Sequence, residues 1–380
     1  MKRIVVLGGG TGGTLVANLL ARRLKRTEAE IVLVSASPRH MYQPGWLYVA
    51  FGRQNPLALS RAERGLLSRR VHLIIDRVTA LDATKQQITL EQGKPLTYDY
   101  LVLATGSRIV PDDVPGFAEG AYHFYLEEAA FRLHTALAEF RGGKVVVGIS
   151  SLPYKCPVAP LEFTFLLDEY LTHRGLRDRS EIVYTFPLGR VFTIESVAEF
   201  AQPLLEQRKV TIETFFNTEE IRPADKLVTS MEMTELNYDL LVMTPPHRGA
   251  RYLEGQPFAD EHGWVQTDRK TLQVAGHANI WALGDTTDLP ISKAGSAAHF
   301  EAPVIVERLT ADLRGTAPDP RHAEYGGHVM CFLETGYGRA CLLDFDYNRP
   351  PKMAEPNAIV HYQKMAFNKA YWYLVPTGVF

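Results

Sequence analysis

The sequence predicts an α/β fold made of two Rossmann-like units followed by a C-terminal hairpin and helix. Three observations support this prediction. A strand, a glycine-rich turn and a helix open the chain within residues 3–24; two later apolar strands end in Ala-Thr-Gly and in Gly-Asp; and a second series of strands and helices lies between those two. At 380 residues, 46% of them hydrophobic, the chain can bury more than one core.

The opening unit is the strand RIVVLG, the turn Gly8-x-Gly10-x-x-Gly13 and a helical pattern that ends near Leu24. The first glycine permits the tight turn, the second lets a pyrophosphate approach the backbone, and the third lets the helix pack closely on the strand. A nucleotide site is therefore expected on this turn. The next strand ends in Ser-Ala-Ser at residues 35–37, so hydroxyl groups stand where a carboxylate usually binds the ribose.

Two further strands end in residues typical of flavoproteins with two dinucleotide-binding domains. The run YDYLVLATG ends in Ala104-Thr105-Gly106, and the run NIWALGD ends in Gly284-Asp285. The first resembles the strand that returns near the flavin nucleotide, and the second resembles the strand whose carboxylate binds the ribityl-phosphate part of FAD. Each pattern is common by itself, but their order along this chain is specific.

These units divide the chain into three regions. We expect residues 1–112 and 246–325 to form an FAD-binding domain, into which residues 113–245 are inserted as a second Rossmann-like domain. Residues 326–380 would add the hairpin HVMCFLETGYGRACLLDF and an aromatic tail.

The inserted domain lacks the glycine-rich loop that would bind NADH. After the strand KVVVGI, residues 150–157 read Ser-Ser-Leu-Pro-Tyr-Lys-Cys-Pro. Prolines cannot donate backbone N–H groups to a phosphate, and Cβ atoms block the close approach that glycine allows. We therefore expect a degenerate NAD domain whose loop, with Cys156 on it, is free for other chemistry.

Composition argues against several other classes of function. With 41 basic and 43 acidic residues, the formal charge of −2 provides no basic face for nucleic acid. No run of about 18 apolar residues could span a bilayer, and we expect no cleavable signal, because the pattern of one does not precede the first strand. The three cysteines, Cys156, Cys331 and Cys341, fit neither a disulfide scaffold nor a zinc spacing, so no metal is expected and they are either inert core thiols or a redox device.

Together these segments resemble the sulfide:quinone oxidoreductase family of the pyridine nucleotide-disulfide oxidoreductase superfamily, a relative of the flavin subunit of flavocytochrome c sulfide dehydrogenase. The resemblance spans essentially the whole chain and includes VLGGGTGG, MYQPGW, YKCPVAPLE, ALGDTTDLPISKAG, the Cys331 hairpin and HYQKMAFNKAYWYL. It implies a glutathione-reductase-like fold and an FAD-dependent enzyme. That enzyme would oxidise hydrogen sulfide to sulfane sulfur or polysulfide and reduce a membrane quinone.

The resemblance also assigns residues to roles. Cys156 and Cys331 would form a redox pair on one face of the flavin, with Cys156 carrying a persulfide and Cys331 attacking the flavin. Phe332, Tyr362 and Phe367, in the C-terminal region, would stack on the quinone ring. The residues assigned to FAD are Gly8, Gly10, Thr11, Gly12, Gly13, Ser35, Ala36, Gln43, Val78, Ala104, Thr105, Gly106, Gly284, Asp285, Lys293 and Gly295.

Physical chemistry supports roles for the residues around Cys156. Lys155 and the start of a helix near Pro160 would lower the pKa of the Cys156 thiol and favour the reactive thiolate. Glu162 is either a proton carrier, if burial raises its pKa, or an ordinary glutamate in the first turn of that helix. Lys293 is either a catalytic positive charge beside the flavin or quinone oxygen or a solvated loop lysine.

The state of Cys341 depends on the register of the hairpin. A turn through residues 335–337 would place Cys341 opposite Cys331, close enough for a structural or competing disulfide. The chain also lacks two cysteines that some relatives carry, one shortly before residue 127 and one near MYQPG. FAD is therefore expected to be bound non-covalently.

The tail from Ile359 to Leu374 has the pattern of an amphipathic helix. Aromatic residues with flanking lysines suit a monotopic anchor at the headgroup boundary of a membrane. The alternative is a helix that docks on the core or on a second subunit of a homo-oligomer. A peripheral membrane location, on the cytoplasmic side, is expected. The proposed apolar side carries Ile359, Tyr362, Ala366 and Tyr373, with Lys364 and Lys369 elsewhere and Trp372 near the end.

Three alternatives to the quinone reductase remain. The chain could oxidise sulfide but donate electrons to a cytochrome or another soluble acceptor. It could resemble a type II NADH dehydrogenase, which the missing glycine loop disfavours. It could also be a flavin-binding module without catalysis.

Overall fold

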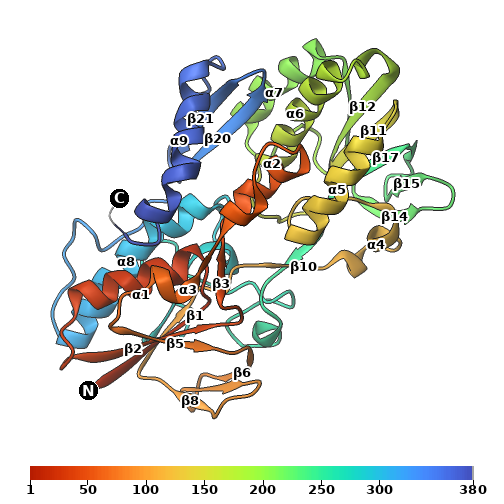
Figure 1. The fold of residues 1–380 in the computed structure, drawn as a ribbon. Coiled ribbons are helices and arrows are strands. Elements are labelled where there is room, and N and C mark those ends of the chain that lie inside the picture. The colour runs from red at the N-terminus through yellow and green to blue at the C-terminus, as the bar shows by residue number, and fades with distance from the viewer. Residues whose placement is uncertain (379–380) are drawn as a thin grey trace.

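The computed structural model describes residues 1–378. It shows two α/β halves and a C-terminal hairpin and helix that pack beside both. One half, at the lower left of Figure 1, contains the N-terminal sheet, and the other, at the upper right, contains the sheet of the inserted segment. The hairpin and the last helix, drawn in blue, lie beside both halves. The predicted α/β fold class is confirmed.

The first sheet is entirely parallel, with the strand order β19-β9-β1-β2-β5. The central strand is apolar and fully buried at Ile4 to Leu7, as expected for a strand covered on both faces. Because all five strands run the same way, their carboxyl ends meet at one edge, where such sheets bind ligands. The strands are β1 (Lys2–Leu7), β2 (Ala29–Ser35), β5 (Val71–Ile75), β9 (Tyr100–Leu103) and β19 (Ile280–Ala282).

Two helices and a small antiparallel sheet cover the faces of the first sheet. Helices α1 (Thr11–Arg23) and α8 (Gly295–Arg314) pack on one face around Leu20 and Ile305. The other face is covered by a core that includes Leu81, Leu253 and Phe258. The antiparallel strands on that side are β6 (Val78–Asp82), β7 (Gln87–Leu90) and β8 (Leu96–Thr97).

The second sheet is also parallel, with the order β13-β12-β11-β17. One face packs on helices, in a core that includes Phe163 and Leu137, and the other face packs on a three-stranded sheet around Phe216 and Ile221. The strands are β11 (Gly143–Ile149), β12 (Ser180–Phe186), β13 (Val210–Thr214), β17 (Leu240–Thr244), β14 (Thr218–Arg222), β15 (Leu227–Ser230) and β16 (Glu235–Asn237); the helices are α5 (Glu127–Glu139), α6 (Ala159–His173) and α7 (Glu195–Gln207).

Short elements connect the two halves. Strand β10 (Arg108–Ile109), where the chain leaves the first half, pairs with β18 (His247–Arg248), where it returns. The remaining elements are β3 (Arg39–Met41), β4 (Ser60–Ala62), α2 (Trp46–Ala50), α3 (Glu63–Leu66), α4 (Phe117–Gly120) and the 3-10 turns Gln43–Gly45, Pro56–Leu59, Pro111–Asp113, Arg177–Arg179, Arg251–Leu253 and Gly284–Thr286.

The C-terminal hairpin has a register that differs from the expected one. Strands β20 (Val329–Gly336) and β21 (Arg339–Phe345) place Leu343 opposite Cys331, and Cys341 opposite Leu333. The turn is two residues long because Tyr337 and Gly338 both adopt positive φ, as two-residue hairpin turns require. The expected direct pairing of Cys331 with Cys341 is therefore wrong, and both cysteines are free.

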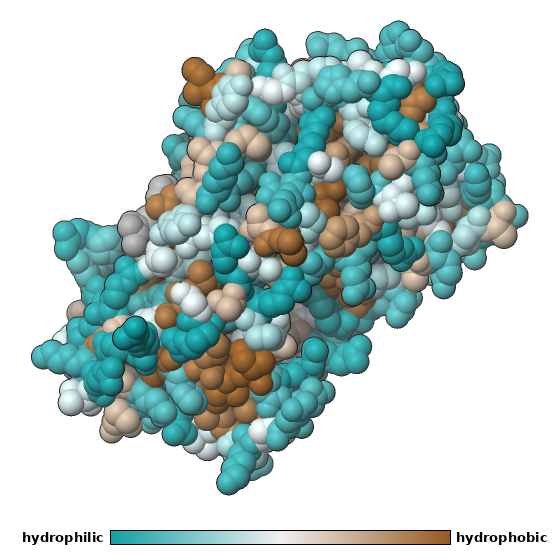
Figure 2. Space-filling model, viewed as in Figure 1, coloured by the Kyte–Doolittle hydropathy of each residue, from teal (hydrophilic) through white to brown (hydrophobic). Residues whose placement is uncertain are grey.

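The last helix, α9 (Ala358–Leu374), has the exposed face that the sequence predicted. Ile359, Tyr362 and Tyr373 are 71%, 70% and 73% exposed. Lys364, which lies on another side of the helix as expected, is buried. Within residues 1–378, no helix is long and apolar enough to cross a membrane. Figure 2 shows a mostly hydrophilic surface in which hydrophobic side chains gather in the lower half of the view and near the junction of the two halves.

Candidate active site

A cavity of about 1190 Å³ extends from the carboxyl edge of the first sheet to the C-terminal hairpin. Its lining comes from the β1–α1 turn, the ends of β2, β9 and β19, the start of α8, the loop before α6, β20 and α9. Segments from both halves and from the C-terminal region therefore meet around one elongated space.

The glycine-rich turn forms one wall of the cavity. A Cβ atom at Gly13 would lie 1.9 Å from the carbonyl oxygen of Gly8, and one at Gly9 would lie 2.4 Å from Ser35 Oγ. By contrast, a Cβ at Gly10 would have no heavy atom within 4 Å. Thus Gly13 is needed for packing of the turn on α1, whereas Gly10 leaves open space above the helix N-terminus, where a phosphate group fits.

The residues that the resemblance assigned to FAD gather around this cavity. Gly13 does not line it, because it lies against Gly8 in the packed base of the turn. The others line it: Gly8, Gly10, Thr11, Gly12, Ser35, Ala36, Gln43, Val78, Ala104, Thr105, Gly106, Gly284, Asp285, Lys293 and Gly295.

Two lysines face the carboxylate of Asp285. Burial raises the pKa of Asp285, and the charges of Lys155 and Lys293 oppose that effect. Lys293 Nζ donates hydrogen bonds to the carbonyl oxygens of Asp285 (3.0 Å) and Thr287 (2.6 Å), and it lies 3.9 Å from the centre of the Trp264 ring. Burial lowers the pKa of Lys293 to about 8. Lys293 is therefore a buried lysine on the cavity wall and not a solvated one.

The loop that carries Cys156 is hydrogen-bonded to the half of the protein that contains the first sheet. The backbone N–H of Cys156 donates to the carbonyl oxygen of Lys293 (2.7 Å), and Lys155 and Lys293 form a parallel β-bridge. Cys156 adopts φ +53°, a left-handed conformation that is uncommon for residues with a side chain. Such outliers cluster at functional sites, where surrounding contacts hold them in place.

Cys331 reaches the same cavity from β20, and the two thiols are close enough to interact electrostatically. Burial raises the pKa of Cys331 to about 12 and raises that of Cys156 as well, with the negative charge of Glu162 adding to both effects. The expected lowering of the pKa of Cys156 is therefore wrong. Burial and the nearby carboxylate outweigh the positive charge of Lys364, which acts in the opposite direction.

Glu162 lies in the first turn of α6, lines the same cavity as the cysteines, and is only 3% exposed. Its carboxylate forms an ion pair with Lys364 Nζ and accepts a hydrogen bond from the backbone N–H of Glu334 (2.8 Å). Burial raises the pKa of Glu162, as the proton-carrier interpretation requires, although Lys364 opposes the shift. Burial would lower the pKa of Lys364, but the charges of Glu162 and Glu334 raise it, so Lys364 stays protonated.

The aromatic residues assigned to the quinone do not all reach the cavity. Phe332 and Phe367 line it, and their ring centres are 6.3 Å apart with a 42° tilt. Tyr362 points to the surface and contacts His361. Its assignment to a ring sandwich in this cavity is corrected, because it lies on the exposed face of α9.

Apart from Phe367, sequence reasoning missed the residues at α9 that face the cavity. Lys364, Asn368 and Tyr371 of α9, and Val375 directly after it, line the cavity. They are spaced by four, three and four residues, the spacing of one face of a helix. The same periodicity that identified the exposed apolar side would have found this buried side.

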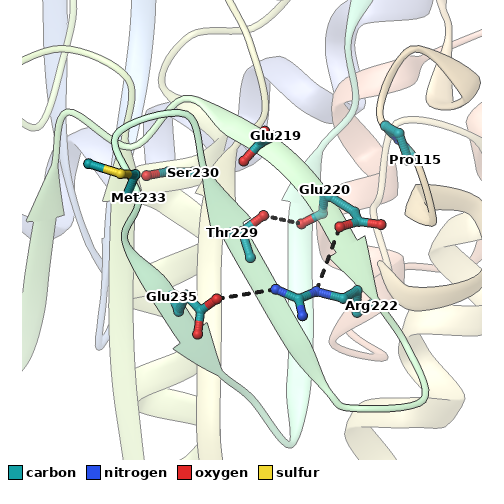
Figure 3. Close-up of a pocket in the computed structure, with 8 residues that line it drawn as sticks. All are labelled: Pro115, Glu219, Glu220, Arg222, Thr229, Ser230, Met233 and Glu235. Carbon is teal, nitrogen blue, oxygen red and sulfur yellow. Dashed lines mark hydrogen bonds and ion pairs between the residues drawn. The ribbon is translucent and has the colours of Figure 1, made fainter.

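A second depression, of about 450 Å³, lies on the sheet formed by β14, β15 and β16, apart from the large cavity (Figure 3). It shares no lining residue with the large cavity. Its charged groups are paired with one another, because Arg222 forms ion pairs with Glu220 (3.6 Å) and Glu235 (3.2 Å), and Thr229 donates to the Glu220 carbonyl. We assign it no role in the chemistry.

Comparison with known proteins agrees with this geometry. The family model described as pyridine nucleotide-disulphide oxidoreductase matches residues 2–150. A mitochondrial sulfide:quinone oxidoreductase of Mus musculus is 30% identical over 92% of this chain and 79% of its own length. The chain belongs to the sulfide:quinone oxidoreductase family. It is accordingly an FAD-dependent oxidoreductase, and the open space at Gly10 and the glycine-lined wall fit that cofactor.

Other members of the family extend the similarity. The mitochondrial sulfide:quinone oxidoreductase of Dictyostelium discoideum is 28% identical over 91% of this chain and 78% of its own length. The crystal structure of the sulfide:quinone oxidoreductase from Aquifex aeolicus superposes with a TM-score of 0.88 at 22% identity, covering 100% of this chain and 92% of that one. The superposition covers the whole of this chain and supports the fold described above.

Proposed function

We propose that this protein oxidises hydrogen sulfide through a redox pair of Cys156 and Cys331 and passes two electrons by way of FAD to a quinone. The observation that carries the proposal is the meeting of two cysteines, from separate segments of the chain, in the cavity that also contains the glycine-lined nucleotide wall. A third cysteine, Cys341, is buried in the hairpin opposite Leu333 and does not line the cavity.

In the proposed step, hydrosulfide attacks the disulfide of the oxidised pair. The Cys156–Cys331 bond breaks, a new sulfur–sulfur bond forms on Cys156, and Cys331 leaves as a thiolate. Sulfide loses the two electrons that the disulfide gains. Reoxidation of the pair requires a two-electron acceptor, and this is the chemistry that FAD supplies when bound.

The raised thiol pKa values mean that neither free thiol ionises readily at rest. Because burial disfavours both thiolates at rest, the reactive thiolate would arise as a leaving group beside the cofactor. Glu162, whose pKa is raised, is the nearby group suited to take the proton of the incoming sulfide. Lys364 would hold the Glu162 carboxylate in place and keep the local charge balanced.

Lys293 would supply positive charge at the flavin end of the cavity. Its ammonium group is held by two backbone carbonyls and faces Asp285. Removal of the positive charge would weaken the stabilisation of negative charge that develops on a reduced ring or a quinone oxygen.

Quinone would bind between the hairpin and α9, at the end of the cavity lined by Phe332 and Phe367. The exposed side of the same helix carries Ile359, Tyr362 and Tyr373, which suits contact with a membrane surface. A quinone could then pass from lipid to the cavity along the helix. Peripheral membrane attachment is thus part of the proposal.

Anaerobic titration of the yellow holoenzyme with sulfide tests this function. Sulfide should bleach the flavin spectrum, and decyl-ubiquinone, offered before cytochrome c, should restore it. Cys156→Ala and Cys331→Ala should each abolish bleaching by sulfide, while Cys341→Ala should retain it. Bleaching by NADH alone would contradict the proposal, and recovery with cytochrome c but not with the quinone would identify a different acceptor.

A further inference from the structure

A buried chain of hydrogen bonds joins the C-terminal helix to the glycine-rich turn. Tyr371, on α9, shares one hydrogen bond of 2.8 Å with His40 Nε2 and another of 2.7 Å with Thr11 Oγ1. His40 Nδ1 lies 3.0 Å from Glu63 Oε2. Glu63 Oε1 in turn accepts a hydrogen bond of 2.7 Å from Thr14 Oγ1. The chain therefore starts and ends on α1, the helix that follows the turn.

Burial of the centre of this hydrogen-bond chain fixes its geometry. The side chains of His40 and Glu63 have no exposed surface, and Thr14 is also fully buried. Buried polar groups are costly unless all are hydrogen-bonded, and a satisfied network fixes the orientation of every member. The Tyr371 hydroxyl is consequently held at one position between His40 and Thr11.

The proton positions follow from the chemistry of the groups. An ionised carboxylate can only accept, so His40 donates from Nδ1 to Glu63. Burial raises the pKa of Tyr371, so its phenol keeps the proton. The phenol can donate one hydrogen bond and accept another, so it joins His40 Nε2 and Thr11 Oγ1 at the same time. This arrangement engages the hydroxyl of Thr11 and fixes its rotamer.

The position of Thr11 connects this network to the cofactor. Thr11 is the first residue of α1, between Gly10 and Gly12, and all three line the cavity together with Tyr371. The open space above Gly10 lies directly before this residue. The network is thus built into the wall where the phosphate groups of the cofactor would bind.

We infer that Tyr371 is a flavin-positioning residue, which the buried His40–Glu63 pair holds against Thr11, so that the C-terminal helix forms part of the FAD site. The inference concerns retention of FAD and does not depend on sulfide or quinone being the substrates. It also extends the role of α9 from a surface element to a component of the nucleotide wall.

Neighbouring contacts also hold the C-terminal end of α9 against the half of the protein that contains the first sheet. The Tyr42 hydroxyl donates to the side chain of Asn368, and Asn18 Nδ2 donates to the Pro376 carbonyl (2.8 Å). The ring centres of Tyr42 and Tyr371 are 4.5 Å apart. The C-terminal part of α9 is therefore docked on the half of the protein that contains the first sheet. The exposed residue Ile359 lies in the N-terminal part of the helix.

The release of FAD from purified holoenzyme tests the inference. Free FAD is followed by its fluorescence after dilution, for the wild type, Tyr371→Phe and the matched control Tyr373→Phe, whose side chain is exposed two residues away. Tyr371→Phe should speed the release about tenfold, as expected for one buried hydrogen-bonding group lost from between two partners. Tyr373→Phe should leave the rate within about twofold.

Two further measurements separate positioning of the cofactor from general stability. Thermal midpoints of apoprotein and holoprotein should show that Tyr371→Phe narrows the gap between them, whereas a merely structural role would lower both equally. Glu63→Gln should also speed the release, and its effect should not add to that of Tyr371→Phe.

Thr11→Val, which removes the hydroxyl and leaves the Tyr371–His40 contact intact, covers the case in which Tyr371→Phe does not fold. It should speed release to a similar extent. Unchanged release of FAD from folded Tyr371→Phe, or from Thr11→Val, would overturn the inference. Faster release from Tyr373→Phe than from Tyr371→Phe would do the same.

Discussion

Lys364 of the C-terminal helix forms a buried ion pair with Glu162 of the helix that follows the Cys156 loop. These two residues are far apart in the sequence but share one wall of the cavity. The Nζ atom of Lys364 also lies 5.4 Å from the centre of the Tyr48 ring, from a third segment of the chain. The pair consequently ties the tail to the wall of the cavity that the two cysteines also line.

Loss of one partner of this pair should destabilise the fold. Lys364→Met would leave Glu162 buried without a cation, and removal of one partner of a buried pair costs about 3 to 5 kcal/mol. Lys369→Met, on the exposed side of the same helix, should have little effect. Urea unfolding of both variants measures the difference, and equal midpoints would show that the pair contributes nothing to stability.

Removal of the Glu162 carboxylate should change how sulfide oxidation depends on pH. Wild-type Glu162 can accept a proton only above its raised pKa, and the acceptor is needed only while sulfide still carries the proton to be removed. The ratio of the Glu162→Gln rate to the wild-type rate should therefore be smallest, with a loss of about a hundredfold, between those two ionisations, and should approach one at lower and at higher pH. Stopped-flow reduction of the flavin by sulfide gives the ratio at each pH. A ratio independent of pH would exclude Glu162 as the proton acceptor.

The two glycines of the turn should respond differently to alanine. Gly13→Ala would push a Cβ atom to 1.9 Å from the Gly8 carbonyl oxygen, so it should destabilise the apoprotein. Gly10→Ala meets no protein atom within 4 Å, so the apoprotein should keep its stability while losing affinity for FAD. Apoprotein melting temperatures and FAD titrations distinguish the two, and wild-type FAD affinity in Gly10→Ala would place the phosphate elsewhere.

A charge on the exposed side of α9 should weaken attachment to membranes without affecting the flavin. Ile359→Glu removes a 71% exposed apolar side chain from that side and should reduce binding to anionic vesicles about tenfold or more. Gln363→Glu adds the same charge at an exposed polar position and serves as the control. Vesicle sedimentation, with FAD content measured in parallel, checks the result. Unchanged sedimentation of Ile359→Glu would argue for docking of this face on another protein.

Much of the flavin site could be predicted from the sequence because its residues lie in short, ordered motifs. The turn from Gly8 to Gly13 and the strand ends at Gly106 and Asp285 are local patterns, and parallel strands necessarily bring their carboxyl ends to one edge. The fold class followed from the same patterns. Local motifs therefore predicted correctly where these residues lie in the structure.

The contacts between distant segments were harder to predict. The burial of Lys364 depends on Glu162, and the role of Tyr371 depends on His40 and Thr11, none of which is near in the sequence. The pKa of Cys156 was expected to fall because only its sequence neighbours were considered, whereas the surrounding apolar contacts determine the direction. The prediction of the hairpin register was wrong because Tyr337 adopts a positive φ, which is uncommon for a tyrosine and could not be expected from the sequence.

The bridge between Lys155 and Lys293 restricts how the two halves can move. Any hinge motion that widened the cavity would first separate the Cys156 backbone from the Lys293 carbonyl, which are 2.7 Å apart. Catalytic turnover should therefore proceed without a rotation of one half against the other.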